Sequence, residues 1–180
     1  IVGTAMFTDI ESFTSIAEGM SAQDTAALLN DYFSVATGHV FDTGGTLIKY
    51  IGDAVFAIWG APIRREDHAT QACIAALALA RAQQDDSANA GPVATLVTRI
   101  GVHTGPMLVG NLGSAQRFDY TAIGDAVNLA SRIEHLNKEY GTNILVSEYT
   151  YLPLKDEFPL AREVDRVRVR GRAQPVHLFE

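Results

Sequence analysis

Cysteine, lysine and long apolar runs are scarce in this sequence of 180 residues. Cys73 is the only cysteine, so neither an intrachain disulfide nor a cysteine-rich zinc site can form, and a reducing, cytoplasmic location is expected. No apolar run approaches the roughly 20 residues of a membrane span, and the first residues lack the pattern of a signal peptide. We therefore expect a domain that makes no membrane contact.

Positively charged residues are also in short supply. Lys and Arg number 14 against 21 Asp and Glu, which gives a net charge of −7. Proteins that bind duplex DNA derive most of their affinity from Lys and Arg, so nucleic acid is not an expected partner. The length and the 47% hydrophobic content indicate one globular domain over residues 1–180. Because the first residue is Ile and a candidate strand follows at once, we expect a part of a longer protein.

Several common catalytic motifs are missing. The sequence has no Gly-Lys dipeptide and hence no P-loop, and it has neither a G-x-S-x-G nor a G-x-G-x-x-G motif. The five histidines are too far apart in sequence to suggest a zinc site, and each is expected to be structural or on the surface. Because the net charge is −7, a polyphosphate ligand would depend on metal ions for much of its charge neutralisation.

Hydrophobic periodicity predicts the order strand–helix–strand–strand–helix–strand. The elements are a strand at 4–7, a helical region at 13–42, strands at 46–50 and 54–59, a helix at 65–84 and a strand at 93–103. This is the ferredoxin-like βαββαβ arrangement, an α+β fold with helices on one face of an antiparallel sheet. The C-terminal extension is predicted to contain a strand at 107–110, a helix at 125–140 and strands at 143–146, 163–170 and 176–179.

Two aspartates lie where predicted strands end. Asp9 closes the run from Ala5, and Asp53 lies in the turn between the strands at 46–50 and 54–59. Because the first strand of a ferredoxin-like sheet pairs beside that hairpin, the two carboxylates are expected to converge. Such a pair suits Mg²⁺, which keeps water and substrate phosphates as its other ligands. Taken singly, each aspartate could instead be local, as a helix cap or a turn residue.

Asn128 and Arg132 are four residues apart on the predicted helix at 125–140 and so share one face. An amide beside a guanidinium group suits a sugar and a phosphate. A solvated helix face would also explain this pair, so the pair alone does not decide between the two.

Together, five segments resemble the catalytic domain of the class III nucleotidyl cyclases, the adenylyl and guanylyl cyclases. They are F-T-D-I-E-S-F-T at 7–14, K-Y-I-G-D-A at 49–54, G-V-H-T-G at 101–105, G-D-A-V-N-L-A-S-R-I-E at 124–134 and V-R-G at 169–171. The resemblance covers nearly the whole chain. It implies the class III cyclase fold, intramolecular phosphoryl transfer that converts ATP to 3′,5′-cyclic AMP and pyrophosphate, and an upstream regulatory domain.

The resemblance also implies roles for individual residues. Asp9 and Asp53 would bind two Mg²⁺ or Mn²⁺ ions, with help from the backbone carbonyl group of Ile10. Asn128 matches the residue that orients the ribose, and Arg132 matches the residue that stabilises the pentavalent phosphorus.

Three further positions concern the base and the phosphates. Lys49 matches the adenine-contacting lysine, where guanylyl cyclases typically carry Glu. Thr121 occupies the position of a second adenine contact that is often Asp; in this it resembles class IIIb, which contains several bicarbonate- or CO₂-responsive cyclases. Arg170 falls where the family often has a phosphate-binding Lys, and it keeps the charge but not the geometry.

The family implies a homodimer with two shared sites. One chain supplies the two aspartates, and the other supplies Lys49, Thr121, Asn128 and Arg132. Two alternatives remain: a guanylyl cyclase, which Lys49 disfavours, and a catalytically silent nucleotide-sensing module, which would be expected to lose a metal-binding Asp, the Asn or the Arg.

Overall fold

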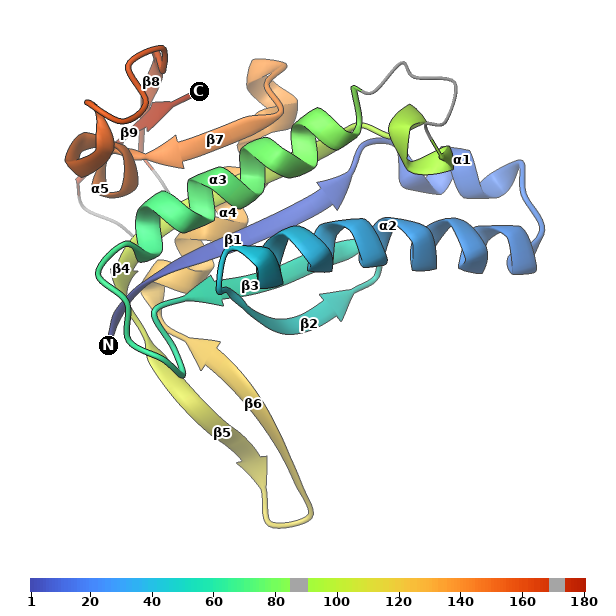
Figure 1. The fold of residues 1–180 in the computed structure, drawn as a ribbon, viewed down its shortest axis with the longest axis horizontal. Helices are drawn as coiled ribbons and strands as arrows, with labels where there is room; N and C mark the ends of the chain where they lie inside the picture. The colour runs from blue at the N-terminus through green and yellow to red at the C-terminus, as the bar shows by residue number, and fades with distance from the viewer. Residues whose placement is uncertain (85–90, 169–173) are drawn as a thin grey trace.

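The computed structural model describes residues 1–84, 91–168 and 174–180, and its described strands form two sheets (Figure 1). The larger sheet has seven strands in the order β2-β3-β1-β4-β7-β9-β8. Their bounds are β1 Val2–Ile10, β2 Thr46–Ile51, β3 Ala54–Trp59, β4 Thr98–Pro106, β7 Ile144–Ser147, β8 Glu163–Val167 and β9 Val176–Phe179. The second sheet is the hairpin of β5 (Leu108–Ser114) and β6 (Arg117–Ile123).

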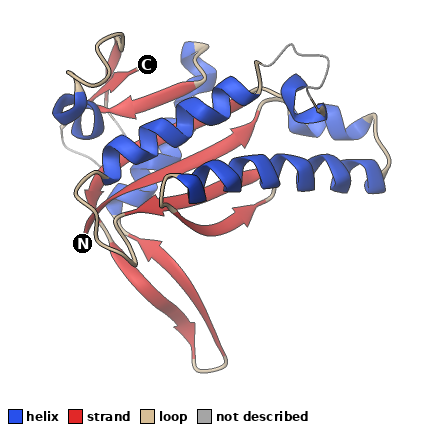
Figure 2. Cartoon of the chain, in the orientation of Figure 1, coloured by secondary structure: helices blue, strands red, loops and turns tan. Residues whose placement is uncertain are grey.

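The described helices cover both faces of the larger sheet (Figure 2). They are α1 Phe13–Glu18, α2 Ala22–Asp42, α3 His68–Ala82, α4 Asp125–Tyr140 and α5 Glu148–Tyr151, with short 3₁₀ helices η1 Pro92–Thr95 and η2 Leu152–Leu154. The order β2-β3-β1-β4, all antiparallel, with α2 and α3 as connections, confirms the ferredoxin-like core. The extension differs from the expected pattern because β7 runs parallel to β4 and α4 lies on the opposite face from α2 and α3.

The predicted helical region at 13–42 is two helices rather than one. The interruption is at Gly19–Ser21, where the Ser21 hydroxyl group accepts a hydrogen bond from the backbone N–H of Asp24 and caps α2. At its other end, α2 stops where predicted. Gly44 adopts a positive φ of 70°, which an L side chain would disfavour, and its N–H donates to the Phe41 carbonyl group.

Two apolar layers hold the helices on the sheet. On the face of α2 and α3, the core contains the fully buried Tyr32 and Trp59. On the other face, small residues bring α4 very close to β4. A Cβ added to Gly101 would lie 2.2 Å from the backbone nitrogen of Glu134. The glycine of the 101–105 segment is therefore required by packing, and it fixes the height of α4 above the sheet.

The hairpin of β5 and β6 projects away from the body of the domain (Figure 1). Only 107–110 was predicted as a strand here; β6 was not predicted. Ala122, at the base of the hairpin, is buried in the core under α4, whereas Phe118 and Ile123 are 63% and 49% exposed. The base of the hairpin therefore belongs to the core, and its outer part does not.

Other differences from the predicted elements are local. The expected strand at 93–103 begins only at Thr98, since η1 occupies its first residues. The helix expected at 65–84 begins at His68, and α5 was not predicted. Of the expected strand at 163–170, the part after 168 lies outside the described residues. Among the helices of the described ranges, none is both long and apolar enough to cross a membrane.

Candidate active site

The carboxylates of Asp9 and Asp53 converge at one end of the sheet. Asp9 is the penultimate residue of β1, and Asp53 directly precedes β3, its antiparallel neighbour. The backbone N–H of Ile10 donates a hydrogen bond to Oδ2 of Asp53 over 3.1 Å. This bond holds the turn between β2 and β3 against the end of β1, as the predicted topology requires.

A buried hydroxyl group braces this corner. The side chain of Thr8, next to Asp9, shares a 2.8 Å hydrogen bond with the Tyr32 hydroxyl group of α2. The same oxygen accepts a 3.1 Å bond from the backbone N–H of Val55 on β3. One threonine therefore links β1, β3 and α2 beside the carboxylates, which favours a rigid site.

The electrostatics of the pair favour a bound cation. Burial, the charge of Asp53 and a hydrogen bond between the two carboxyl groups together raise the pKa of Asp9 from 3.8 to about 6. Within the described ranges, no cluster of three or more His, Cys, Asp or Glu side chains could hold a metal. Two carboxylates with few other protein ligands suit Mg²⁺ or Mn²⁺, which retain water and phosphate oxygens, and do not suit a structural zinc ion.

Arg99 is a site residue that the sequence analysis did not single out. It is the register partner of Asp9 across β1 and β4, and its side chain is only 15% exposed. Its Nη2 donates to Oε1 of Glu11 over 2.5 Å. The positive charge lowers the pKa of Asp9, although burial and Asp53 outweigh it. The available signal in the sequence was a single Arg within the predicted strand at 93–103.

Lys49 lies on the same face of the sheet as α4. A β-bulge at Ile48 shifts the register so that Lys49 pairs with Phe56, whose side chain packs in the core under α4. Bulges commonly re-aim side chains at functional sites. Thr121 of β6 pairs with Gly110, and β6 contacts β2, so the two expected base contacts come from neighbouring strands.

Asn128 and Arg132 project from the outer side of α4. Both are exposed, whereas Leu129 and Ile133 are buried on the inner side. The predicted sharing of one helix face is therefore correct, and that face points away from the sheet that carries Asp9. Arg170 lies outside the described residues.

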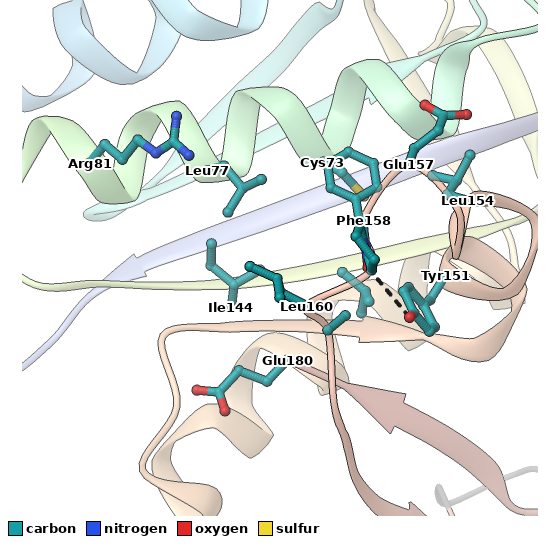
Figure 3. A pocket seen from close by; sticks show the side chains of 13 residues that line it. Cys73, Leu77, Arg81, Ile144, Tyr151, Leu154, Glu157, Phe158, Leu160 and Glu180 are labelled. Atoms are coloured by element: carbon teal, nitrogen blue, oxygen red, sulfur yellow. Dashed lines mark hydrogen bonds between the residues drawn. The ribbon is translucent and has the colours of Figure 1, made fainter.

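A mainly apolar cavity lies elsewhere in the domain. Its volume is about 380 Å³, and α3, β7, α5 and residues 157–161 contribute its walls (Figure 3). None of the expected site residues lines it. Cys73 lies in its wall, and burial raises the pKa of that thiol to about 12, so it is no nucleophile at neutral pH.

Residues 3–179 match the family described as the Adenylate and Guanylate cyclase catalytic domain, and the chain belongs to this family. Adenylate cyclase 1 of Rhizobium meliloti is 41% identical over 179 residues, 98% of this chain and 27% of that protein. The adenylate cyclase of Anabaena cylindrica is 36% identical over 187 residues, 98% of this chain and 36% of that protein. The chain thus spans only about a third of the length of each of these relatives.

Solved structures agree with the family. The adenylyl cyclase CyaB from P. aeruginosa superposes with a TM-score of 0.83 at 32% identity, covering 99% of this chain and 92% of that chain. The guanylate cyclase domain of RhGC from Catenaria anguillulae, solved with GTP, gives 0.82 at 29% identity, covering 99% and 94%. The predicted class III cyclase fold and the predicted membership among the cyclases are confirmed.

Proposed function

We propose that this domain is an adenylyl cyclase that converts ATP to 3′,5′-cyclic AMP and pyrophosphate. The observation that carries the proposal is the convergence of Asp9 and Asp53, held by the hydrogen bond from Ile10; Lys49, on the α4 face of the sheet, would serve the site that holds the aspartates of the second copy. Structural neighbours include both adenylyl and guanylyl cyclases, so the preference for adenine or guanine depends on the side chains that contact the base. An ammonium group donates to N1 of adenine but meets the N1–H donor of guanine, and Lys49 therefore favours ATP.

Asp9 and Asp53, with the carbonyl oxygen of Ile10, would hold two Mg²⁺ or Mn²⁺ ions. These cations supply the positive charge that activates the 3′-hydroxyl group and neutralises the phosphates. Arg99, from the same corner, adds a guanidinium group that the phosphates can reach. The protein thus acts by positioning and by electrostatic stabilisation, and no covalent intermediate with the enzyme is needed.

Asn128 would orient the ribose, and Arg132 would stabilise the charge that develops on the phosphorus. Lys49 and Thr121 would read the adenine edge, since a hydroxyl group can accept from the adenine amino group. Arg170 is proposed as a further phosphate contact. The charge that an acidic domain needs for a tetra-anionic substrate then comes from these side chains and the cations.

The site is completed by a second copy of the chain. Because α4 buries its inner side on its own sheet, Asn128 and Arg132 face outward and do not point at the Asp9 of the same chain. The exposed apolar side chains of Leu108, Phe118 and Ile123 on the projecting hairpin give a partner an apolar surface. A two-fold symmetric homodimer would then hold two equivalent sites.

Thr121 motivates a modest activation by bicarbonate or CO₂, which a rate measurement at fixed pH and ionic strength tests; a flat response would withdraw it. A regulatory domain upstream of this chain would control the activity, since the curated relatives extend well beyond the matched segment.

The test is an assay of the purified domain with ATP and with GTP, each with Mg²⁺ and with Mn²⁺, and with the products identified by mass. We expect cyclic AMP as the main product. Cyclic GMP as the main product would identify a guanylyl cyclase, and the absence of any cyclic nucleotide would identify a silent module.

A further inference from the structure

A continuous row of polar side chains links two histidines on opposite faces of the sheet. We call it the hydroxyl chain; its members are, in order, His68, Thr4, Thr104, Thr150, Ser147 and His103. The successive contacts are 2.8 Å from Nδ1 of His68 to Thr4, 2.8 Å to Thr104, 3.1 Å to Thr150, 3.4 Å to Ser147 and 2.7 Å to Nδ1 of His103.

The path crosses the sheet where β7 ends. Thr4 and Thr104 are register partners on β1 and β4, and they lie on the face of Met6 and Val102, under α3. His103, the next residue on β4, faces α4 instead. Ser147 is the last residue of β7, so the chain passes around this strand end from one face to the other.

Most of the hydroxyl chain is withdrawn from water, and Thr104 is half-buried. Thr4, Ser147 and Thr150 are fully buried, and His103 is 1% exposed. Among the described residues, no buried side-chain nitrogen or oxygen atom lacks a hydrogen-bond partner. Because an unmade hydrogen bond is costly at such depth, the donors and acceptors along the chain must match.

One directed bond fixes the donors on the side of His68. A hydroxyl group donates a single hydrogen bond, and Thr150 donates to Thr104. With every hydroxyl hydrogen used inside the hydroxyl chain, Thr104 donates to Thr4 and Thr4 donates to Nδ1 of His68, a direction that both contacts allow. Nδ1 of His68 is therefore an acceptor, so its ring is neutral with the proton on Nε2.

The same rule applies on the side of His103. Since the hydrogen of Thr150 is already used, Thr150 accepts from Ser147, and Ser147 in turn accepts from His103. His103 is therefore in the Nδ1–H tautomer. If His68 gains a proton, its Nδ1 becomes a donor, and keeping every hydroxyl hydrogen inside the chain then requires each hydroxyl group to reverse. Nδ1 of His103 must then accept, which moves its proton to Nε2.

The far end of the hydroxyl chain lies under the first turn of α4. A Cβ added to Gly105 would lie 3.0 Å from Cβ of Ala126 and 3.2 Å from Nε2 of His103. The imidazole ring thus borders the position where α4 starts, and Tyr149 of α5 packs edge-on against it at 5.6 Å between ring centroids. Asn128 and Arg132 follow on the next turns of the same helix.

We propose that His103 is a positioning residue for α4 and that its tautomer is set, through the hydroxyl chain, by the protonation state of His68. Its effect on catalysis rests on the proposed function of Asn128 and Arg132. The tautomer change itself does not.

Charged groups surround His68, but burial outweighs them in setting its pKa. Arg64, Arg65, Glu66 and the amino group of Ile1 line the same surface cavity. Asp67 stays ionised, because hydrogen bonds from Arg65 lower its pKa to about 2. Partial burial lowers the pKa of His68 despite the charge of Asp67, so the ring is neutral at pH 7 and titrates below its ordinary value.

The direct test is a titration from pH 8 to pH 5 of the whole domain with ¹⁵N-labelled histidine, since ring ¹⁵N shifts distinguish the two tautomers. We expect His103 to change from Nδ1–H to Nε2–H with the midpoint of His68. Thr4→Val removes one hydroxyl group at nearly constant shape and should abolish this coupling, whereas Thr4→Ser should retain it. Constant His103 shifts in the wild type while His68 titrates would overturn the proposal, whether or not Thr4→Val folds.

A second measurement addresses positioning. The pH profile of kcat for the wild type and for Thr4→Ser should contain a step at the His68 midpoint, and Thr4→Val should lack that step with an unchanged KM. Identical profiles in all three proteins would overturn the positioning role. A wild type that forms no cyclic nucleotide would instead overturn the proposed function, and the ¹⁵N titration would still decide the tautomer coupling.

Discussion

Asp53 accepts a 3.1 Å hydrogen bond from the backbone N–H of Ile10, and this single contact joins the β2–β3 turn to the end of β1. It places Asp53 beside Asp9 before any cation is bound. Preorganisation of this kind avoids reordering the site on each turnover, at the cost of holding two carboxyl groups close together. The raised pKa of Asp9 is the measurable consequence of that proximity and of burial.

The raised pKa of Asp9, about 6 instead of 3.8, predicts pH-dependent metal binding. A proton competes with the cation below about pH 6, because a carboxyl group must ionise before it can act as a ligand. The apparent affinity for Mg²⁺ should therefore fall as the pH drops through 6 and level off above 7. Titration calorimetry at constant ionic strength measures this, and equal affinities at pH 5.5 and 7.5 would contradict it.

The same shift predicts that Asp9→Asn separates activity from stability. A folded-state pKa above the unfolded value stabilises the fold fully below pH 3.8, and that contribution is lost as the pH rises through 6. At pH 7.5 the metal-free wild type thus carries an ionised, partly buried carboxylate that destabilises the fold, and Asn removes this charge. We expect more than about a tenfold loss of cyclisation, because a ligand is removed, together with a gain of about 1 kcal/mol, discounted for partial exposure.

Thermal melts in EDTA and rates in Mg²⁺ check both parts. Asp119→Asn, which neutralises an exposed carboxylate on β6, is the control and should change neither quantity. An Asp9→Asn protein that keeps its activity, or that is less stable without metal, would argue against the assignment of Asp9.

Lys49→Glu should lower the ratio of ATP turnover to GTP turnover by about tenfold or more. Donor and acceptor mismatches at a base edge cost several kcal/mol when the groups stay buried against the ligand. Lys155→Glu makes the same change in charge outside the proposed site and serves as the control. If both variants keep the wild-type ratio in product analysis by mass, Lys49 does not read the base.

Gly101→Ala should destabilise the domain by about 2–3 kcal/mol, because its Cβ would meet the backbone of α4 at 2.2 Å and the helix would have to move. Gly38→Ala, where a Cβ meets nothing within 4 Å, should be neutral or slightly stabilising. Urea unfolding of both variants provides the comparison. Equal stability of the two would mean that α4 does not approach β4 this closely.

Elements with a strong local signal were predictable from the sequence. The strand Ala54–Trp59 and the helix Asp125–Tyr140 were predicted with the bounds that the structure has. Each has a clear apolar pattern, and the helix ends at Gly141, whose φ of +64° favours glycine. β6 was missed although Phe118, Tyr120 and Ala122 alternate with polar residues; of these three only Ala122 is buried, so most of the strand faces no core.

The candidate site likewise contains residues that the sequence predicted and residues that it did not. The convergence of Asp9 and Asp53 followed from topology, because adjacent strands of a known sheet order place their ends together. The contribution of Arg99 did not, because its pairing with Glu11 joins residues 88 apart in the sequence and depends on the β1–β4 register. The roles of Lys49, Thr121, Asn128 and Arg132 came from resemblance, and the geometry of one chain alone cannot assign them.

Sharing of the site between two chains predicts complementation. Asp9 lies on the sheet, whereas Arg132 projects from the outer side of α4, so we place them in the same site only through a partner. Asp9→Ala and Arg132→Ala homodimers should each lose nearly all activity, because every site then lacks one of the two groups.

A mixture of the two variants that exchanges subunits should regain activity. In each heterodimer one site carries both defects and the other carries neither, so statistical mixing gives half heterodimers with one intact site each, about a quarter of the wild-type rate. Native mass measurements establish the fraction of heterodimer, and Asp9→Ala mixed with itself is the control. A mixture that stays as inactive as its parents although heterodimers are present would show that each site belongs to one chain.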